Sequence, residues 1–245
     1  METTKKSRDT IQSLSIGISI LDAIAKAKRP LKITEIQEET NITKSNLYKY
    51  INTLVQDDLI FRDQNSGLYH LGSKLIQYGM TAMGNQDVLA IISPYLQSIS
   101  DHTNNTALFS VPTFNGPVIA KITRSNQILN IGAEIGTLLP PYSAAGKIFN
   151  LFAEQHKTKK WKENYQSTIM EDLDEAQTIR EEKIAFAKEP LISEVSSVAL
   201  PILNYLNELI GIITLVGFSS DIPDTIEDPQ SKFLQKMQKE ISKNF

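Results

Sequence analysis

The sequence predicts an α+β protein with two domains, a small helical domain followed by a larger domain built on a sheet. The chain has 245 residues, which suits one or two domains. Apolar residues recur every three to four positions in the first 60 residues, a spacing typical of helices. Later in the chain, short apolar runs of strand length alternate with turn signals such as Asn115-Gly116.

Three helices are predicted near the start. The first spans residues 12–27, with one apolar stripe formed by Ile11, Leu14, Ile18, Leu21 and Ala25. Thr34 and Gln37 have the spacing of a capping box, so a second, short helix is expected to begin at Thr34 and to end near residues 40–41. Thr43 is the candidate N-cap of the third helix, whose inward stripe is Leu47, Ile51, Leu54 and Val55.

A hairpin is predicted directly after these helices. Residues 59–62 and 68–71 have strand character, and Gly67 ends the turn between them. Three helices followed by a hairpin constitute a winged helix-turn-helix. Ser73 then caps a further helix over residues 74–83, and the linker is placed at residues 84–86.

The second part of the chain alternates between strand and helix patterns. An antiparallel sheet with helices packed on it is therefore expected. Strands are predicted at residues 106–111, 118–122, 129–133, 195–200 and 210–216. Helices are predicted at residues 88–102, 143–155, 172–188 and 229–244.

The outer face of the third helix has the composition of a DNA-reading surface. It carries two cations, several neutral hydrogen-bonding groups, one aromatic ring and no carboxylate, in Lys44, Ser45, Asn46, Tyr48, Lys49 and Asn52. Phosphates attract Lys, and base edges are read by Asn, Ser or Lys. The alternative is a solvated face of a purely structural helix; the preceding short helix and the hairpin favour DNA binding.

A run of small residues, from Ser143 to Gly146, opens a later helix. Small side chains let a ligand approach the backbone, and the N–H groups of a first helical turn stabilise an anion. Leu129, Ile131 and Leu138 are candidates for apolar walls. The alternative is that Ala144 and Gly146 are small only because a helix packs closely on the sheet.

These segments resemble the IclR family of bacterial transcription regulators. The resemblance lies in SLSIGISILDAIAKAKRPLKITEIQEETNITKSNLYKYINTLVQDDLIFRDQNSGLYHLGSKLIQYG, in GAEIGTLLPPYSAAGKIF and in SEVSSVALPILNYLNELIGIITLVG. It implies a winged helix-turn-helix DNA-binding domain (residues 1–72), a linker helix (residues 73–87) and a GAF-like effector-binding and oligomerisation domain (residues 88–245). It also implies dimers, or pairs of dimers, on operator DNA.

The resemblance assigns roles to individual positions. DNA-binding residues are then Thr34, Thr43, Lys44, Ser45, Asn46, Tyr48, Lys49 and Arg62. Effector-binding residues are Leu129, Ile131, Leu138, Ser143, Ala144, Ala145, Gly146, Ser197 and Thr214. The chain departs from the family pattern in PPYSAAGKI, which lacks the usual His, in IAFAKEP, and at Ser197, where Cys is frequent. These departures bear on which effector is bound.

Composition and motifs give less support to other functional classes. The net charge is −3, but residues 1–80 hold 11 Lys and Arg against 9 Asp and Glu, and the remainder holds 14 against 19. There is no cysteine, no pair of the three histidines has metal-ligand spacing, and no nucleotide-loop or nucleophile-elbow motif is present. We therefore expect no catalysis, metal or cofactor; an enzyme with an accessory DNA-binding domain is the less favoured alternative.

The expected partners follow from the two domains. They are operator DNA, a small organic effector, most simply an organic acid, and further copies of the chain. A DNA-binding protein that only dimerises, without a ligand, is the second alternative. No apolar run reaches the roughly 18 residues of a membrane helix and no secretory signal is visible, so no membrane partner and a cytoplasmic location are expected.

Overall fold

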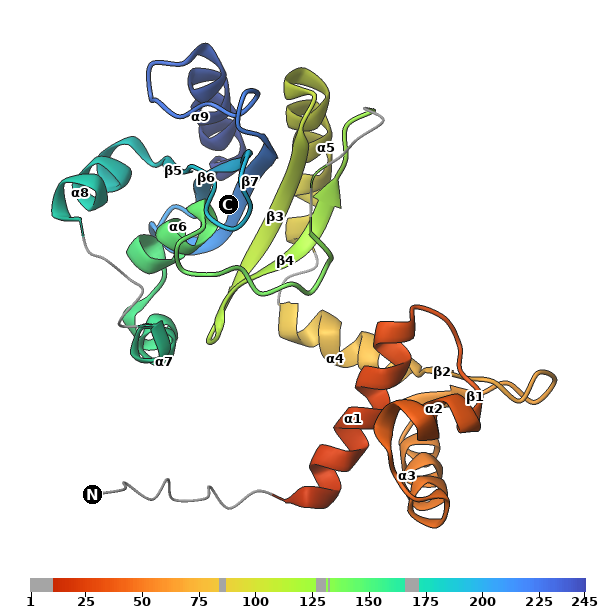
Figure 1. Ribbon diagram of the computed structural model, residues 1–245. Coiled ribbons are helices and arrows are strands. Elements are labelled where there is room, and N and C mark those ends of the chain that lie inside the picture. Colours follow the sequence, from red (N-terminus) through yellow and green to blue (C-terminus); the bar gives the residue numbers. More distant parts are fainter. Residues whose placement is uncertain (1–10, 84–86, 127–130, 132, 166–171) are drawn as a thin grey trace. The chain divides into compact units, whose positions relative to one another are not determined.

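The computed structural model describes residues 11–83, 87–126, 131, 133–165 and 172–245 of the chain. The chain divides into two compact units, residues 1–84 and 85–245 (Figure 1). The first unit holds the winged helix-turn-helix and the helix predicted at residues 74–83. The second holds the sheet.

The first unit packs three helices against a two-stranded hairpin. Its elements are α1 (Gln12–Ala27), α2 (Ile33–Thr40), α3 (Lys44–Gln56), β1 (Ile60–Arg62), β2 (Tyr69–Leu71) and α4 (Ser73–Met83). The core draws on all of them except α4, through Ile20, Ile24, Leu31, Ile36, Leu47, Ile51, Leu54, Ile60 and Tyr69. Leu31 also pairs with Tyr69 through two backbone hydrogen bonds, which fix the hairpin to the chain between α1 and α2.

Most of the predicted apolar stripe of α1 does not face the core. Ile11, Leu14 and Ile18 are 71%, 64% and 48% exposed and Ala25 is also exposed, whereas the buried residues of α1 are Ile20, Ala23 and Ile24, outside the predicted stripe. The first half of α1 therefore presents apolar side chains to solvent.

The starts of α2 and α3 differ from the sequence-based prediction in detail. The N-cap of α2 is Lys32, and the backbone N–H of Lys32 donates to Glu35 Oε2 at 2.7 Å. The prediction that Thr34 caps this helix is wrong, because the helix already begins at Ile33 and Thr34 lies in its first turn. Thr43 does occupy the N-cap position of α3, with extended backbone angles, but its side chain makes no capping hydrogen bond.

The second unit is a five-stranded sheet whose neighbouring strands are all antiparallel. The strands are β3 (Thr106–Thr113), β4 (Gly116–Thr123), β5 (Ala185–Ala187), β6 (Val195–Leu203) and β7 (Leu209–Phe218), in the order β4-β3-β7-β6-β5. The helices are α5 (Asp87–Thr103), α6 (Ala144–Phe152), α7 (Gln155–Tyr165), α8 (Leu173–Glu182) and α9 (Pro229–Ser242). The predicted hairpin at Asn115-Gly116 joins β3 to β4.

Helices cover both faces of this sheet. On one face, α5 and α9 pack against alternate residues of the central strands, including Phe109, Val198 and Leu215. On the other, α6, α7 and α8 form a second core with residues that include Ala199 and Ile212. Because side chains alternate along a strand, neighbouring residues of β3, β6 and β7 belong to different layers.

Three predicted elements are wrong in extent. The charged helix expected over residues 172–188 ends at Glu182, because Lys183 adopts a left-handed conformation and residues 185–187 pair with β6 as β5. The helix expected over residues 143–155 ends at Phe152, and α7 follows as a separate helix. Of the strand expected at residues 129–133, residues 129, 130 and 132 lie outside the described residues, and Ile131 and Ala133 belong to no strand.

Candidate DNA interface and effector site

The outer face of α3 is exposed and unpaired. Lys44, Ser45, Asn46, Tyr48, Lys49 and Asn52 are all exposed, while Leu47, Ile51 and Leu54 on the opposite face are buried. Among the described residues, the side chains of the outer face make no hydrogen bond or ion pair with the protein. The core therefore orients α3 so that its donors and cations point to solvent, which is the state that groove binding requires.

The helix-turn-helix geometry follows from the backbone conformation between α2 and α3. Asn41 ends α2 in a left-handed conformation with φ of 54°, and only residues 41–43 separate α2 from α3. A turn of this length is typical of the motif. Because the Thr43 hydroxyl does not cap α3, the first backbone N–H groups of α3 have no partner from that side chain. The N-terminus of α3 thus has no side-chain cap, an arrangement that favours anions.

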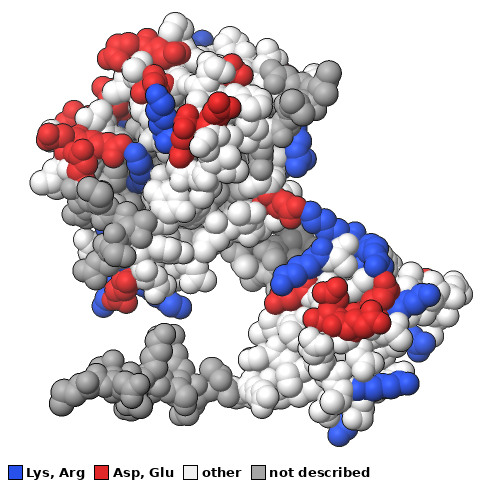
Figure 2. Space-filling view, viewed as in Figure 1, with Lys and Arg blue, Asp and Glu red and all other residues white. Residues whose placement is uncertain are grey.

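Charge is segregated on this unit. In Figure 2 the acidic side chains gather over α2, and the surface over α3 shows Lys and Arg without Asp or Glu. Phosphate is therefore attracted to α3 and repelled from α2. Thr34, which lies on α2, is exposed and next to Glu35, in a less favourable setting for phosphate than Thr43.

The turn of the hairpin is built by Asp63 and Gly67. Asp63 accepts hydrogen bonds from the Asn65 N–H and the Ser66 hydroxyl, and Gly67 adopts φ of 69°, which glycine tolerates without cost. The hydrogen bond from the Ser66 side chain is the main cause that lowers the pKa of Asp63 below its usual value. Arg62 is exposed, with its guanidinium 5.9 Å from the centre of the Tyr69 ring.

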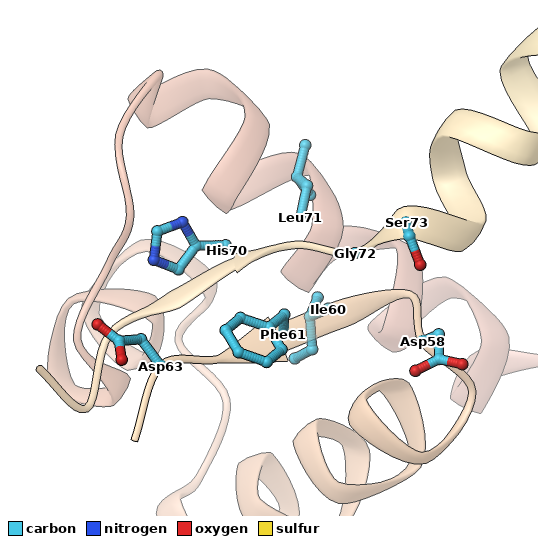
Figure 3. A pocket seen from close by; sticks show the side chains of 8 residues that line it. All are labelled: Asp58, Ile60, Phe61, Asp63, His70, Leu71, Gly72 and Ser73. Carbon is cyan, nitrogen blue, oxygen red and sulfur yellow. The ribbon is translucent and has the colours of Figure 1, made fainter. Parts of the chain in front are cut away.

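A cavity of about 550 Å³ lies beside the hairpin (Figure 3). Phe61 and His70 pair across β1 and β2, and their ring centres are 6.3 Å apart. The cavity is lined by Asp58, Ile60, Phe61, Asp63, His70, Leu71, Gly72 and Ser73. Two carboxylates on its rim disfavour a DNA phosphate, so this side of the hairpin does not fit the DNA backbone.

In the second unit, the small-residue run forms the first turn of α6. Ser143 is the N-cap: its hydroxyl accepts from the Gly146 N–H at 3.0 Å and donates to the Pro140 carbonyl at 2.7 Å. Ala144, Ala145 and Gly146 are buried. A Cβ on Gly146 would lie 2.2 Å from the Pro140 carbonyl oxygen, so the size of this residue has a packing reason. The N–H groups of Ala144 and Ala145 belong to the turn's unpaired donors.

The residues predicted as apolar walls of the effector site differ in how far they are buried. Ile131 is half-buried, whereas Leu138 is 40% exposed and bridges to Val118 along the outer edge of β4. Leu129 lies outside the described residues. Lys147, in the first turn of α6, binds Glu175 Oε1 at 2.6 Å and the Phe186 carbonyl at 2.9 Å, and so ties α6 to α8 and β5.

Ser197 and Thr214 both lie on the sheet face that α6 covers. Thr214 pairs with Ala199 of β6, and Ser197 is two residues away on the same side of that strand. Ser197 and Thr214 are 8% and 4% exposed. Ser197 also lines a cavity of about 270 Å³ at the end of β6 and β7, together with residues that include Ala187 and Ser219.

Five buried polar side-chain atoms in the described residues have no hydrogen-bond partner. They are Thr106 Oγ1, Ser110 Oγ, Asn150 Oδ1, Trp161 Nε1 and Thr214 Oγ1. All belong to the α6 side of the sheet or to the helices that cover it. A buried polar group without a partner is costly, and such groups cluster where a ligand or water completes the bonding.

Two of these residues, Thr106 and Ser110, are not among those predicted from the sequence. The pattern of residues 106–110 did contain a signal: Thr106, Leu108 and Ser110 alternate with apolar residues that face the other layer. Once β3 is recognised as buried on both faces, a polar residue at alternate positions calls for a partner.

Neither a metal site nor a membrane span emerges from the described residues. No group of three or more His, Asp or Glu side chains there is placed to hold a metal ion. Likewise, no helix in the described ranges is both long and apolar enough to cross a bilayer.

A winged helix-turn-helix with an open, acid-free α3 is the fold of a DNA-binding protein, and a second unit with a helix-covered sheet follows it. Two family descriptions match the chain: the IclR helix-turn-helix domain over residues 13–64 and the C-terminal domain of the bacterial transcriptional regulator IclR over residues 80–243. The chain belongs to the IclR family of bacterial transcriptional regulators.

Individual relatives agree with this assignment. The transcriptional regulator XynR of Escherichia coli is 26% identical over 227 residues, covering 87% of this chain and 89% of XynR. The IclR structure from Thermotoga maritima has 22% identity and a TM-score of 0.73, covering 96% of this chain and 99% of that one. An IclR homologue from Microbacterium hydrocarbonoxydans, solved with 4-hydroxybenzoate, has 13% identity and a TM-score of 0.73, covering 95% and 98%.

Proposed function

We propose that the protein is a sequence-specific regulator that binds operator DNA as a dimer or tetramer and is controlled by a small organic acid bound beneath α6. The observation that carries the DNA-binding half is the exposed, unpaired and acid-free face of α3. Lys44 and Lys49 supply charge for phosphates, Ser45, Asn46 and Tyr48 supply groups for base edges, and Thr43 and Arg62 flank them.

Exposed apolar side chains support self-association. Ile11, Leu14 and Ile18 form one exposed row on α1, and Ile76 and Met80 lie exposed on α4. Covering such side chains in an interface is favourable. Two copies would place two α3 helices about 34 Å apart, one turn of B-DNA, so that effector-dependent changes in spacing alter affinity.

Two unpartnered features support an effector beneath α6. The first-turn N–H groups of Ala144 and Ala145 suit a carboxylate, and the Thr214 hydroxyl is buried without a partner. Ser143 and Gly146 shape this turn, and Ser197 and Ile131 complete the proposed site. A chain that only binds DNA and dimerises remains the second candidate, but in such a protein no ligand would provide hydrogen-bond partners for these buried polar groups.

The test is selection of bound genomic fragments, followed by affinity measurements on the recovered operator. Asn46→Ala is expected to cost about 1–3 kcal/mol and to relax specificity at one base pair. The matched variant Glu39→Ala removes an exposed side chain from α2 and is expected to leave binding intact. Operator binding that Asn46→Ala and Lys49→Ala both leave unchanged would contradict the assignment of α3.

A further inference from the structure

Helix α9 presents a row of lysines to solvent. The helix is held against the sheet by its apolar face, which includes Leu234, Met237 and Ile241. After Pro229, every exposed residue within α9 is a lysine, and one more exposed lysine follows at its C-terminal end. This lysine row consists of Lys232, Lys236, Lys239 and Lys243. Spacings of three and four residues place the four side chains on one side of the helix.

The ammonium groups of the lysine row are free to meet a partner from outside. Among the described residues, none of the four side chains takes part in a hydrogen bond or an ion pair. The row contrasts with the rest of this part of the chain, since residues 81–245 hold 14 Lys and Arg against 19 Asp and Glu. A local concentration of positive charge attracts anions even when the domain around it is acidic.

The row borders a groove of about 620 Å³ between α9 and the end of α8. Five cations line the groove, the four lysines of the row and Lys183, against the three carboxylates of Glu181, Glu182 and Glu240. Glu182 accepts a hydrogen bond from Gln235 Nε2 at 3.2 Å, which gives its carboxylate a partner within the protein. The lining is therefore net positive, and most of its positive charge comes from α9.

The composition of the row favours a nucleic-acid backbone over a protein surface. Lysine is depleted at the centre of protein–protein interfaces, where aromatic residues are enriched, and no apolar residue of α9 other than Pro229 is exposed. Protein–DNA interfaces are much more positively charged. From Lys232 to Lys243 the row spans about 16 Å, a length over which one strand of duplex DNA carries about five phosphates. The row thus matches a DNA strand in both charge and length.

We propose that the lysine row is a second DNA-binding surface, which contacts phosphates of the duplex outside the segment that α3 reads. Phosphate contacts carry no sequence information, so the row adds affinity and salt dependence without changing which bases are preferred. The inference goes beyond the proposed function, because it gives the second unit a role in DNA binding that involves no effector.

The first experiment follows binding of the full chain to a long duplex of random sequence at increasing salt concentrations. The variant Lys232→Gln/Lys236→Gln/Lys239→Gln removes three charges from exposed positions, so its melting temperature is expected to match that of the parent. Its affinity for the duplex is expected to fall by about tenfold or more, and its salt slope by about 0.9 for every phosphate contact that is lost.

A matched control separates the row from the overall charge of the second unit. Lys159→Gln/Lys160→Gln/Lys188→Gln removes the same number of exposed charges from α7 and from the chain after β5, and is expected to weaken binding far less. Equal losses in the two triple variants, or no loss in either, overturn the inference. Asn46→Ala is expected to alter operator binding but not binding to random sequence, so a failure of the α3 assignment is observed separately.

The second experiment locates the contact by acetylation of lysine amines, read by mass spectrometry. On a duplex that carries the recovered operator and flanking DNA, the lysine row is expected to react several-fold more slowly than in the free protein, while Lys159 and Lys160 keep their reactivity. On a duplex trimmed to the operator, the row is expected to react as in the free protein. Protection by polyglutamate but not by the flanked duplex would indicate an acidic protein partner and overturn the inference. Unchanged reactivity of the row on the flanked duplex also overturns it.

Discussion

The α3 face and the sheet face beneath α6 both carry hydrogen-bonding groups that the protein leaves unpartnered. On α3 these groups are exposed, so water satisfies them until DNA replaces it. Beneath α6 they are almost fully buried, with Ser110 at 0% exposure. An exposed group costs the fold nothing, whereas a buried one reduces stability. The exposed groups of α3 therefore do not lower the stability of the first unit, whereas the buried groups beneath α6 lower the stability of the second.

The largest expected effect contrasts the two sides of α3. Ile51→Ala empties a core position that is 1% exposed and is expected to cost about 2–5 kcal/mol of the first unit's unfolding free energy. Lys49→Ala, on the outer face, is expected to change stability by less than about 0.5 kcal/mol. Urea unfolding followed by circular dichroism measures both. Lys49→Ala, which hardly affects stability, is the variant expected to affect DNA binding: it should lower the salt slope of operator binding by about one.

The second effect tests the packing of the first α6 turn. Gly146→Ala places a Cβ 2.2 Å from the Pro140 carbonyl oxygen and is expected to cost about 1–3 kcal/mol. Gly17→Ala in α1 is the control, because nothing lies within 4 Å of the added Cβ, and it is expected to gain up to about 1 kcal/mol. The Trp161 fluorescence transition monitors the second unit. An unshifted transition in Gly146→Ala would contradict the close approach.

A smaller effect concerns the link between α6, α8 and β5. Lys147→Met removes the bonds to Glu175 and to the Phe186 carbonyl, and is expected to cost about 0.5–1 kcal/mol, because the ammonium is partly exposed. Thermal unfolding followed by Trp161 measures the change. Lys188→Met, at an exposed lysine beside β5, serves as the comparison and is expected to be neutral.

The smallest effect depends on pH and lies at the start of α2. A hydrogen bond from Arg29 is the main cause that lowers the pKa of Glu35, followed by the Lys32 backbone. The stabilisation is therefore complete above the usual pKa of a glutamate and is lost as the pH falls through the lowered folded-state value. Glu35→Gln is expected to unfold at slightly lower urea than the parent at neutral pH. The two proteins should coincide well below the folded-state pKa; a constant difference would contradict this account.

The α3 face was predictable from the sequence because it depends on one helix period. Leu47, Ile51 and Leu54 fix which side is buried, so the composition of the other side follows. The alternation of Thr106 and Ser110 with apolar residues is visible in the sequence, but the face on which they lie depends on pairing with β7, more than 100 residues later. The predicted extent of α8 was wrong for a related reason. Residues 185–187 pair with β6, and this pairing overrides their local helical pattern.

The uncapped start of α3 has a consequence for how the protein meets DNA. In the free protein, the Thr43 hydroxyl makes no capping bond, so the opening turn of α3 is held mainly by the apolar residues that follow it. A bound phosphate would act as the missing cap and order that turn. Amide hydrogen exchange at Ser45 and Asn46 is accordingly expected to slow on the operator far more than exchange at the helix centre. The first turn of α3 would then become fully ordered only when DNA is bound.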